Sequence, residues 1–362
     1  MEATSSRMQG DLATPSSVND SEDREIMPMM SISGGPWGLV HQPIHESLTL
    51  SALVSCGYDV AQGTTLSNAS TQDWEYLRGA VWNDDPQGLL FKDTADNNHR
   101  YWTGYDWFSR YRDGAKEWQD GRPQDNALRN PTGRSHYGDL QFLHCMACHS
   151  GEAPQETKRK MMVWLEVMYK LANEEDDMTG GTLIENTKLI EFCPVLSLPP
   201  SFKSLHYLLS ADTKFQGVDV KRRALGSIFH IIQDSYAIGH TRRTPLNPLD
   251  KQSDDPLKFK PGTYDRWGPI ENFHTYGGQD TNAHSHFDHS NDAIPNPGNL
   301  GDVSQFDGLV GCRMAVEKCK ELIALKRAGK GWDDDHGVRK YLDEDVFALA
   351  TQVSPANNQV WG

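Results

Sequence analysis

The sequence predicts an all-α protein with long loops, and three observations support this fold class. Apolar residues recur at helical spacing in several segments, and no alternating strand pattern stands out. The stretches between these segments are rich in Gly, Pro, Asn and His, as loops are. We find no internal repeat and no clear linker in the 362 residues. We therefore expect one helical domain over residues 37–362, after a disordered Ser- and Asp-rich tail over residues 1–36.

The expected helices alternate with two long irregular regions. One region, residues 83–134, contains an aromatic-rich stretch, and the other, residues 244–300, is rich in Pro, Gly, Asn and His. Irregular segments this long are usually functional. We expect most of the aromatic side chains around residues 101–109 to be core, although a cage for a choline-like cation or a lipid contact is the alternative. The helices are expected over residues 41–56, 71–82 (with Thr71 as N-cap), 136–149, 154–175, 217–240, 303–328 and 335–352.

The composition excludes some classes of function. The formal net charge is −15, whereas proteins that bind long nucleic-acid duplexes usually present a basic face. A small phosphorylated substrate stays compatible with this charge, because metal ions can supply positive charge locally. No apolar stretch approaches the roughly 20 residues of a membrane span. The N-terminus does not resemble a signal peptide, so we expect a cytoplasmic protein or one exported without a classical signal.

Residues 145–149 spell C-x-x-C-H, a pattern typical of covalent haem attachment, and C-x-x-C alone can be a redox pair. Haem attachment requires export, and a redox pair of this type expects a βαβ setting. A structural zinc site would need a second cysteine pair. We therefore expect no haem, two small buried thiols at Cys145 and Cys148, and an incidental His149. The six cysteines of the chain are expected to be reduced.

The segment 217–240 carries the clearest chemical signal. Its apolar residues predict a buried helix, yet His230 and Asp234 lie four residues apart on one face. A buried ionised aspartate is costly unless it is paired or binds a metal. The pair alone is compatible with a hydrogen-bonded core contact. However, His240 follows, and residues 281–292 form a second dense cluster in which His284 and Asp288 repeat the spacing. Histidine and carboxylate ligands without thiolate suit zinc in a hydrolytic site.

This order of motifs resembles the zinc-dependent phospholipase C and fungal single-strand nuclease superfamily. The segment FHIIQDSYAIGHTRR, residues 229–243, carries most of the resemblance. The resemblance implies an all-helical fold that holds two to three zinc ions in a cleft. It implies that His230 and Asp234 bind the first zinc, and that Asp234 also reaches the zinc near the N-terminus. His240, His284 and Asp288 would hold the remaining zinc.

The resemblance also implies ligands upstream, and several alternatives stay open there. An aspartate on the first zinc matches Asp84 best, in VWNDD, with Asp85 as the alternative. For the histidine that accompanies it we prefer His144 to His99, because the segment around His144 is expected to be helical.

The N-terminal patch departs from the pattern of the superfamily. Its members begin, after processing, with a tryptophan that binds zinc through its amino group, whereas Trp37 here follows 36 residues. His41 and His45 lie four residues apart and could together replace that amine. We prefer His45.

The resemblance implies a zinc-dependent hydrolase of phosphoric esters, in which a zinc-activated water attacks phosphorus. Phospholipid headgroup esters are the expected substrates, with a possible peripheral membrane contact. A single-strand nuclease or nucleotidase, or a phosphatase on another small phosphoester, is the alternative. A non-catalytic interaction protein stabilised by zinc is an alternative of another class. Asp84 would bind the metal and could guide the proton of the water. Arg242 and Arg243 could clamp the phosphate, or they could be surface charges.

Overall fold

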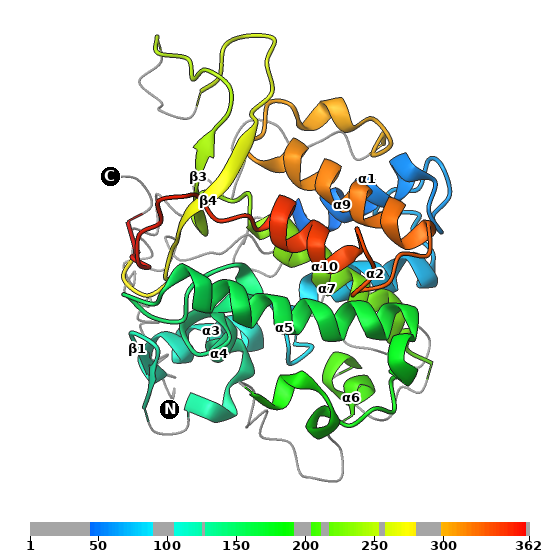
Figure 1. Ribbon diagram of the computed structural model, residues 1–362. Helices are drawn as coiled ribbons and strands as arrows, with labels where there is room; N and C mark the ends of the chain where they lie inside the picture. Colours follow the sequence, from blue (N-terminus) through cyan, green and yellow to red (C-terminus); the bar gives the residue numbers. More distant parts are fainter. Residues whose placement is uncertain are drawn as a thin grey trace, which may run out of the picture.

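The fold is mostly helical, and two short two-stranded sheets accompany the helices (Figure 1). The computed structural model describes residues 44–89, 105–124, 127–191, 204–210, 217–252, 258–279 and 298–359. The expected tail over residues 1–36 lies outside this part of the chain. The described α-helices are α1 (Ile44–Cys56), α2 (Thr71–Trp82), α3 (Tyr105–Glu117), α4 (Pro131–Tyr137), α5 (Pro154–Asn173), α6 (Leu205–Ser210), α7 (Val220–Asp234), α9 (Cys312–Arg327) and α10 (Val338–Tyr341).

Helix α7 is the central element of this arrangement. It contacts α1, α2, α5, α6 and α9, and it runs behind α5 and α10 in the view of Figure 1. Almost all of its residues are buried, as its apolar sequence predicts. Its N-terminus is capped by the side chain of Asp219, which accepts hydrogen bonds from the backbone N–H groups of Lys221 and Arg222. A helix buried on every side places its few polar side chains inside the molecule.

Two glycines bring α2 and α7 into close contact. A Cβ atom at Gly79 would collide with the backbone of Arg223, and one at Gly226 would collide with the carbonyl oxygen of Tyr76. The two backbones therefore touch where neither helix has a side chain. This contact brings the residues that follow α2 next to the side chains of α7.

The boundaries of several helices differ from the expectation. Ser70, rather than Thr71, is the N-cap of α2, because its hydroxyl accepts from the N–H of Asp73 while the carboxylate of Asp73 accepts from the N–H of Ser70. Helix α7 ends at Asp234, well before Gly239. The C-terminal helix expected over 335–352 is confined to α10 and a π-turn, Leu342–Val346.

The continuous helix expected over residues 136–149 is wrong. Helix α4 ends at Tyr137, and a short 3-10 helix, Gln141–His144, follows it. Cys145 then adopts a left-handed conformation with φ 54°, which stops the 3-10 helix. Helical periodicity does not distinguish one long helix from two short turns with a reversal between them.

The expectation of an all-α protein is also too strong. Strand β3 (Thr241–Pro245) pairs antiparallel with β4 (Trp267–Phe273), which lies inside the region expected to be irregular. Register shifts interrupt this pairing, and a two-residue pair, β1 (Trp118–Gln119) with β2 (Arg122–Pro123), forms a second small sheet. The hairpin of β3 and β4 leaves the helical body, and its connection projects from it (Figure 1). Strands this short and irregular leave little alternation in the sequence.

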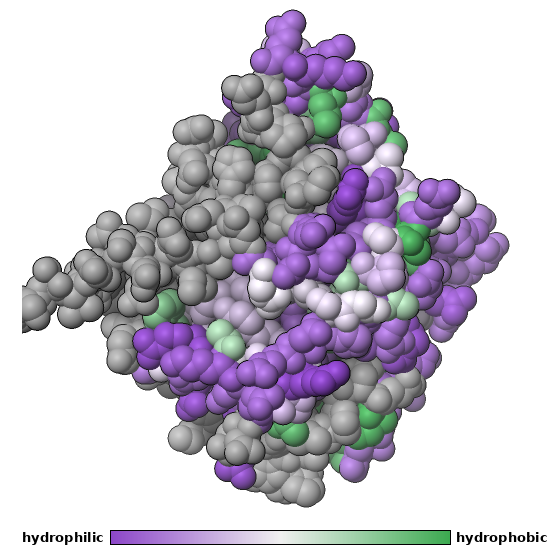
Figure 2. Space-filling model, turned by 90° about the vertical axis from the view of Figure 1, so that its left-hand side faces the viewer, coloured by the Kyte–Doolittle hydropathy of each residue, from purple (hydrophilic) through white to green (hydrophobic). Residues whose placement is uncertain are grey.

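Figure 2 shows one face on which hydrophobic residues form small separate spots among hydrophilic ones. Among the described residues, the large hydrophobic side chains that are exposed are Leu128, Ile190, Leu246 and Tyr264. No described helix combines the length and the hydropathy that a membrane span requires.

Candidate metal centre

Two aspartates and five histidines converge beside α7, and each of them is at most 4% exposed. They come from segments that are far apart in the sequence. They are His45 in α1, Asp84 just after α2, His136 in α4, His144 at the end of the 3-10 helix, His230 and Asp234 in α7, and His240 after α7. Burial of so many ionisable groups in one place requires a compensating interaction.

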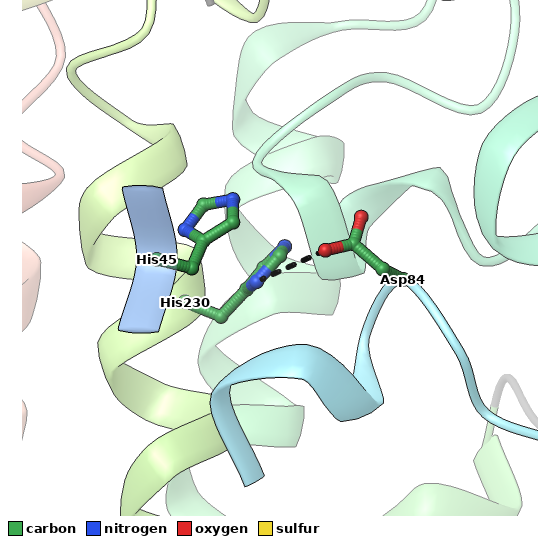
Figure 3. Close-up of side chains that lie close together, drawn as sticks. All are labelled: His45, Asp84 and His230. Carbon is green, nitrogen blue, oxygen red and sulfur yellow. Dashed lines mark ion pairs between the residues drawn. The ribbon is translucent and has the colours of Figure 1, made fainter. Parts of the chain in front are cut away.

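The carboxylate of Asp84 lies between three of the histidines. Its Oδ1 atom is 3.8 Å from Nε2 of His136 and 3.7 Å from Nδ1 of His144. Its Oδ2 atom is 3.9 Å from Nδ1 of His230, the ion pair drawn in Figure 3. Two ligands of a tetrahedral zinc ion lie about 3.3 Å apart, because each is about 2.0–2.1 Å from the metal. The separations around Asp84 are slightly wider than this value.

The carboxylate of Asp234 contacts the other members of the cluster. Its Oδ2 atom lies 2.9 Å from Nε2 of His230, 3.1 Å from Nδ1 of His144 and 3.4 Å from Nδ1 of His240. Its Oδ1 atom lies 3.4 Å from Nε2 of His45. Figure 3 shows the rings of His45 and His230 side by side, and their centroids are 4.1 Å apart. His144 and His230 therefore lie near both aspartates.

Hydrogen bonds to oxygen atoms identify the protonated ring nitrogen of four histidines. A carbonyl oxygen can only accept, so the nitrogen next to it must carry the proton. The donor and acceptor pairs are His45 Nδ1 with Gln233 Oε1 (2.7 Å), His136 Nδ1 with Thr132 O (2.8 Å), His144 Nε2 with Asn83 O (3.1 Å), and His240 Nδ1 with His144 O (2.7 Å). Metal-binding histidines are typically oriented in this way by a bond from the second nitrogen.

This choice of tautomer leaves lone pairs that face carboxylates. In His45 and His136 the unprotonated nitrogen points to an oxygen of Asp234 or Asp84, which also accepts only. The unprotonated Nδ1 atom of His144 lies 3.1 Å from Oδ2 of Asp234 and 3.0 Å from Nε2 of His230. Two acceptors that face each other in a buried site repel unless a cation lies between them.

Four buried polar atoms of the cluster have no hydrogen-bond partner. They are Asp84 Oδ2, His136 Nε2, His230 Nδ1 and Asp234 Oδ1. Leaving such atoms unsatisfied is costly, and native proteins do so rarely. Three overlapping groups have ligand atoms that all lie within 4.8 Å of one another, and each group could hold a metal ion: His45 with Asp84 and His230, Asp84 with His136 and His144, and His144 with His230 and Asp234.

The protonation states favour the binding of a cation. Burial opposes the ionisation of Asp84, but the neighbouring His230, His136 and His144 outweigh it and hold its pKa at about 2. In the same way, His230, His240 and His45 outweigh burial and keep the pKa of Asp234 well below its usual value. Burial lowers the pKa of His144 to about 4. At neutral pH, both carboxylates are therefore charged while His144 keeps its lone pair.

The pKa values of two other histidines of the centre, His45 and His230, are shifted in opposite directions. Burial and the nearby His230 both lower the pKa of His45. Burial disfavours the charged form of His230, but Asp234 and Asp84 outweigh it and raise its pKa. Of these two histidines, His230 is thus the one whose charged form the surroundings favour.

A second layer of hydrogen bonds holds the cluster in place. Asn83 donates to the carbonyl oxygen of Leu143 and accepts from the hydroxyl of Ser227, which in turn accepts from the indole of Trp164. This network connects the end of α2 to α5 and α7. The indole of Trp107 donates to the carbonyl oxygen of Asp84 at 2.9 Å. Trp107 is buried, as expected for the aromatic-rich stretch, while Tyr101 and Trp102 lie outside the described residues.

His136 was not anticipated from the sequence. Rings of Trp107, Tyr111 and Tyr276 meet its imidazole edge-to-face, with centroids 5.6, 5.1 and 6.1 Å away. His136 joins the centre because α4 places it beside Asp84, which follows α2, and no local sequence pattern indicates this contact. Gln233, which orients His45, was also not anticipated, although a polar residue in an apolar helix is a usable signal.

The expected phosphate clamp by Arg242 and Arg243 is wrong. Successive residues of a strand point to opposite faces, and both arginines lie in β3. Arg243 is buried and donates to the carbonyl oxygens of Ser235, Gly268 and Val346. Arg242 points outward and pairs with Glu271 at 3.2 Å. Arg243 therefore holds the hairpin against the helical body, and the two guanidinium groups cannot grip one phosphate together.

Several predicted ligands lie outside the described residues. These are His284 and Asp288 of the second cluster, the alternatives His41 and His99, and Trp37. Of the other pairs of alternatives, Asp84 belongs to the centre, whereas Asp85 accepts a hydrogen bond from the backbone N–H of Leu89. His45 and His144 also belong to the centre.

The cysteines next to His144 are buried free thiols, as expected. Burial raises the pKa of Cys145 well above its usual value and that of Cys148 to about 12. Thiols in this state are poor nucleophiles and poor metal ligands. The side chain of His149 is 49% exposed and lies 3.6 Å from Glu152. The centre thus includes His144, which directly precedes the C-x-x-C-H pattern, and none of the residues of the pattern itself.

Comparison with protein-family models found no match. Comparisons with curated proteins and with solved structures also found no match.

Proposed function

We propose that the chain is a metal-dependent hydrolase of phosphoric esters, with zinc as the cation and phospholipid headgroup esters as the substrates. The observation that carries the proposal is the set of buried, unpartnered nitrogen and oxygen atoms that converge around Asp84 and Asp234. Imidazole and carboxylate donors without thiolate suit zinc and related first-row divalent cations. His45, Asp84, His136, His144, His230, Asp234 and His240 are the side chains that would hold such cations.

A divalent cation held there would lower the pKa of a bound water to about 7 and neutralise charge that develops on phosphoryl oxygens. The residues of the chain supply the rest. Asp84 stays ionised at neutral pH, and a carboxylate beside the cation can orient that water. The bonds from His136 and His144 to backbone carbonyl oxygens fix the direction of their lone pairs. The resemblance to phospholipase C favours a phosphodiester with a lipid leaving group, and the charge of −15 disfavours a polyanionic strand.

The degree of burial supports a second candidate function. A catalytic zinc keeps an open coordination position, whereas a structural zinc is enclosed by protein ligands. All seven residues of the centre are at most 4% exposed, as expected for an ion that holds helices together. In this candidate, the protein is a metal-stabilised binding module without hydrolytic activity.

Substitution of Asp84 separates the two candidates. We expect Asp84→Asn to lower the hydrolysis of phosphatidylcholine or of bis(4-nitrophenyl) phosphate by about 100-fold or more, because loss of even an outer-shell partner costs 10- to 100-fold. Metal per chain and the far-UV circular dichroism spectrum are measured on the same samples. Asp85→Asn is the matched control, since the amide oxygen can still accept from Leu89.

Each outcome assigns a function. Hydrolysis by the wild type that Asp84→Asn abolishes and Asp85→Asn retains supports the hydrolase. Faster cleavage of a single-stranded oligonucleotide than of phosphatidylcholine would identify a nuclease. Bound zinc without hydrolysis of any of these substrates would establish the structural candidate and refute the hydrolase.

A further inference from the structure

His136 is in excess of what the resemblance requires. The resemblance implies a first zinc with Asp84, one upstream histidine, His230 and Asp234 as ligands. The structure supplies two upstream histidines, His136 and His144, and both face Oδ1 of Asp84. The second histidine needs a function of its own.

The geometry divides the donors into two sets around Asp84. Its Oδ2 atom faces His230, and these two residues form one group of three donors with His45. Its Oδ1 atom faces His136 and His144, and these three residues form another group. The two groups have only Asp84 in common, and each of them could hold a metal ion.

We propose that Asp84, His136 and His144 form a second position for a first-row divalent cation, and that the Asp84 carboxylate bridges it to the position at His45 and His230. The position has three protein ligands, two imidazoles and one carboxylate, and therefore leaves coordination sites for water and substrate. The role of the ion in catalysis rests on the proposed function, but its binding does not.

Two observations make the position a built site. Nε2 of His136 is buried and has no hydrogen-bond partner, and the bond from Nδ1 to Thr132 directs its lone pair toward Asp84. The edge-to-face contacts with Trp107, Tyr111 and Tyr276 prevent the ring from turning away. A ring held this firmly is pre-organised for a ligand.

The test is the number of zinc ions bound per chain. The full-length protein is stripped with dipicolinate, dialysed against buffered Zn²⁺ and measured by plasma mass spectrometry. We expect His136→Asn to bind one equivalent fewer than the wild type. His336→Asn is the control, because His336 is exposed and its left-handed φ of 54° suits asparagine. It should bind as many ions as the wild type. An unchanged count in folded His136→Asn would overturn the proposal.

A second variant applies if His136→Asn does not fold. His136→Cys replaces the imidazole by a thiolate ligand, and Co²⁺ bound there should show a sulfur-to-cobalt charge-transfer band that the wild type lacks. Absence of the band in the Co²⁺-loaded variant would overturn the proposal. Loss of one ion in His136→Asn together with an inactive wild type would retain the position and refute the proposed hydrolase.

Discussion

The candidate metal centre depends on which nitrogen of each histidine carries the proton. A histidine in a protein core is often a satisfied hydrogen-bonding residue, and His230 with Asp234 could be such a pair. The difference here is that His45 and His136 each donate one N–H to an oxygen and turn the other nitrogen toward a carboxylate. A hydrogen-bonded core would have paired these atoms with donors.

Gln233 provides a test of this orientation. Its Oε1 atom accepts from His45, its Nε2 atom donates to Thr49, and it is buried. We expect Gln233→Leu to weaken zinc binding by about 10- to 100-fold, because His45 loses the acceptor that fixes its tautomer. Competition with a fluorescent zinc chelator measures the affinity. Gln233→Glu keeps an acceptor and should restore most of it, and equal affinities in wild type and Gln233→Leu would show that His45 is not a ligand.

At the scale of elements, the contact between α2 and α7 decides where the aspartates lie. Asp84 comes just after α2 and Asp234 ends α7, so the packing of these two helices sets the distance between the carboxylates. Gly79 and Gly226 permit this contact, because a Cβ atom at either position would overlap the backbone of the other helix.

We expect Gly226→Ala to lower the free energy of unfolding by about 1–3 kcal/mol or more, because the added methyl group forces the two backbones apart. Urea denaturation measures this change. Gly217→Ala is the matched control, since a Cβ atom there meets no atom within 4 Å. The shift of α2 should also reduce the zinc content of Gly226→Ala. A variant as stable as Gly217→Ala would show that the helices adjust without cost.

At the scale of the whole molecule, the buried histidines of the metal-free protein make its stability depend on pH. The folded protein keeps His144 neutral with a pKa of about 4, whereas the unfolded chain protonates it near its ordinary value of 6.5. The unfolded state therefore binds more protons between these values, and stability falls as pH falls through this window. His45 acts in the same direction. The pKa of His230 is raised, so above the ordinary value of 6.5 the folded protein binds more protons than the unfolded chain. In that range, His230 therefore lowers stability as the pH rises.

We expect the stripped protein to lose about 1–3 kcal/mol of stability between roughly pH 7 and pH 4.5, since one pKa unit corresponds to about 1.4 kcal/mol. Thermal unfolding across this range measures the loss. Zinc at a hundredfold excess over Kd should add about 2.7 kcal/mol near neutral pH. Replacement of His144 by Asn should flatten the pH dependence. A stripped protein whose stability rises toward pH 4.5 would contradict the assigned protonation states.

Much of the fold follows from local sequence, and its irregular parts do not. Helices α2 and α5 are close to the expected ranges because apolar periodicity and capping residues act over a few neighbours. The break after Tyr137, the early end of α7 and the strand β4 depend on contacts with distant segments. The pairing of β4 with β3, for example, involves residues some 30 positions apart.

Helical spacing in the sequence by itself singled out His230 and Asp234, because two polar residues four positions apart in an apolar helix are visible in one dimension. The resemblance to the phospholipase C and nuclease superfamily then pointed to Asp84, His45, His144 and His240. Only the tertiary structure showed that His136 joins them, that Gln233 orients His45, and that Arg243 is used to hold the hairpin. The reason is physical: a residue type and its spacing are local, whereas the direction of a lone pair and the partner of a buried atom are decided by the packing of segments far apart in the chain.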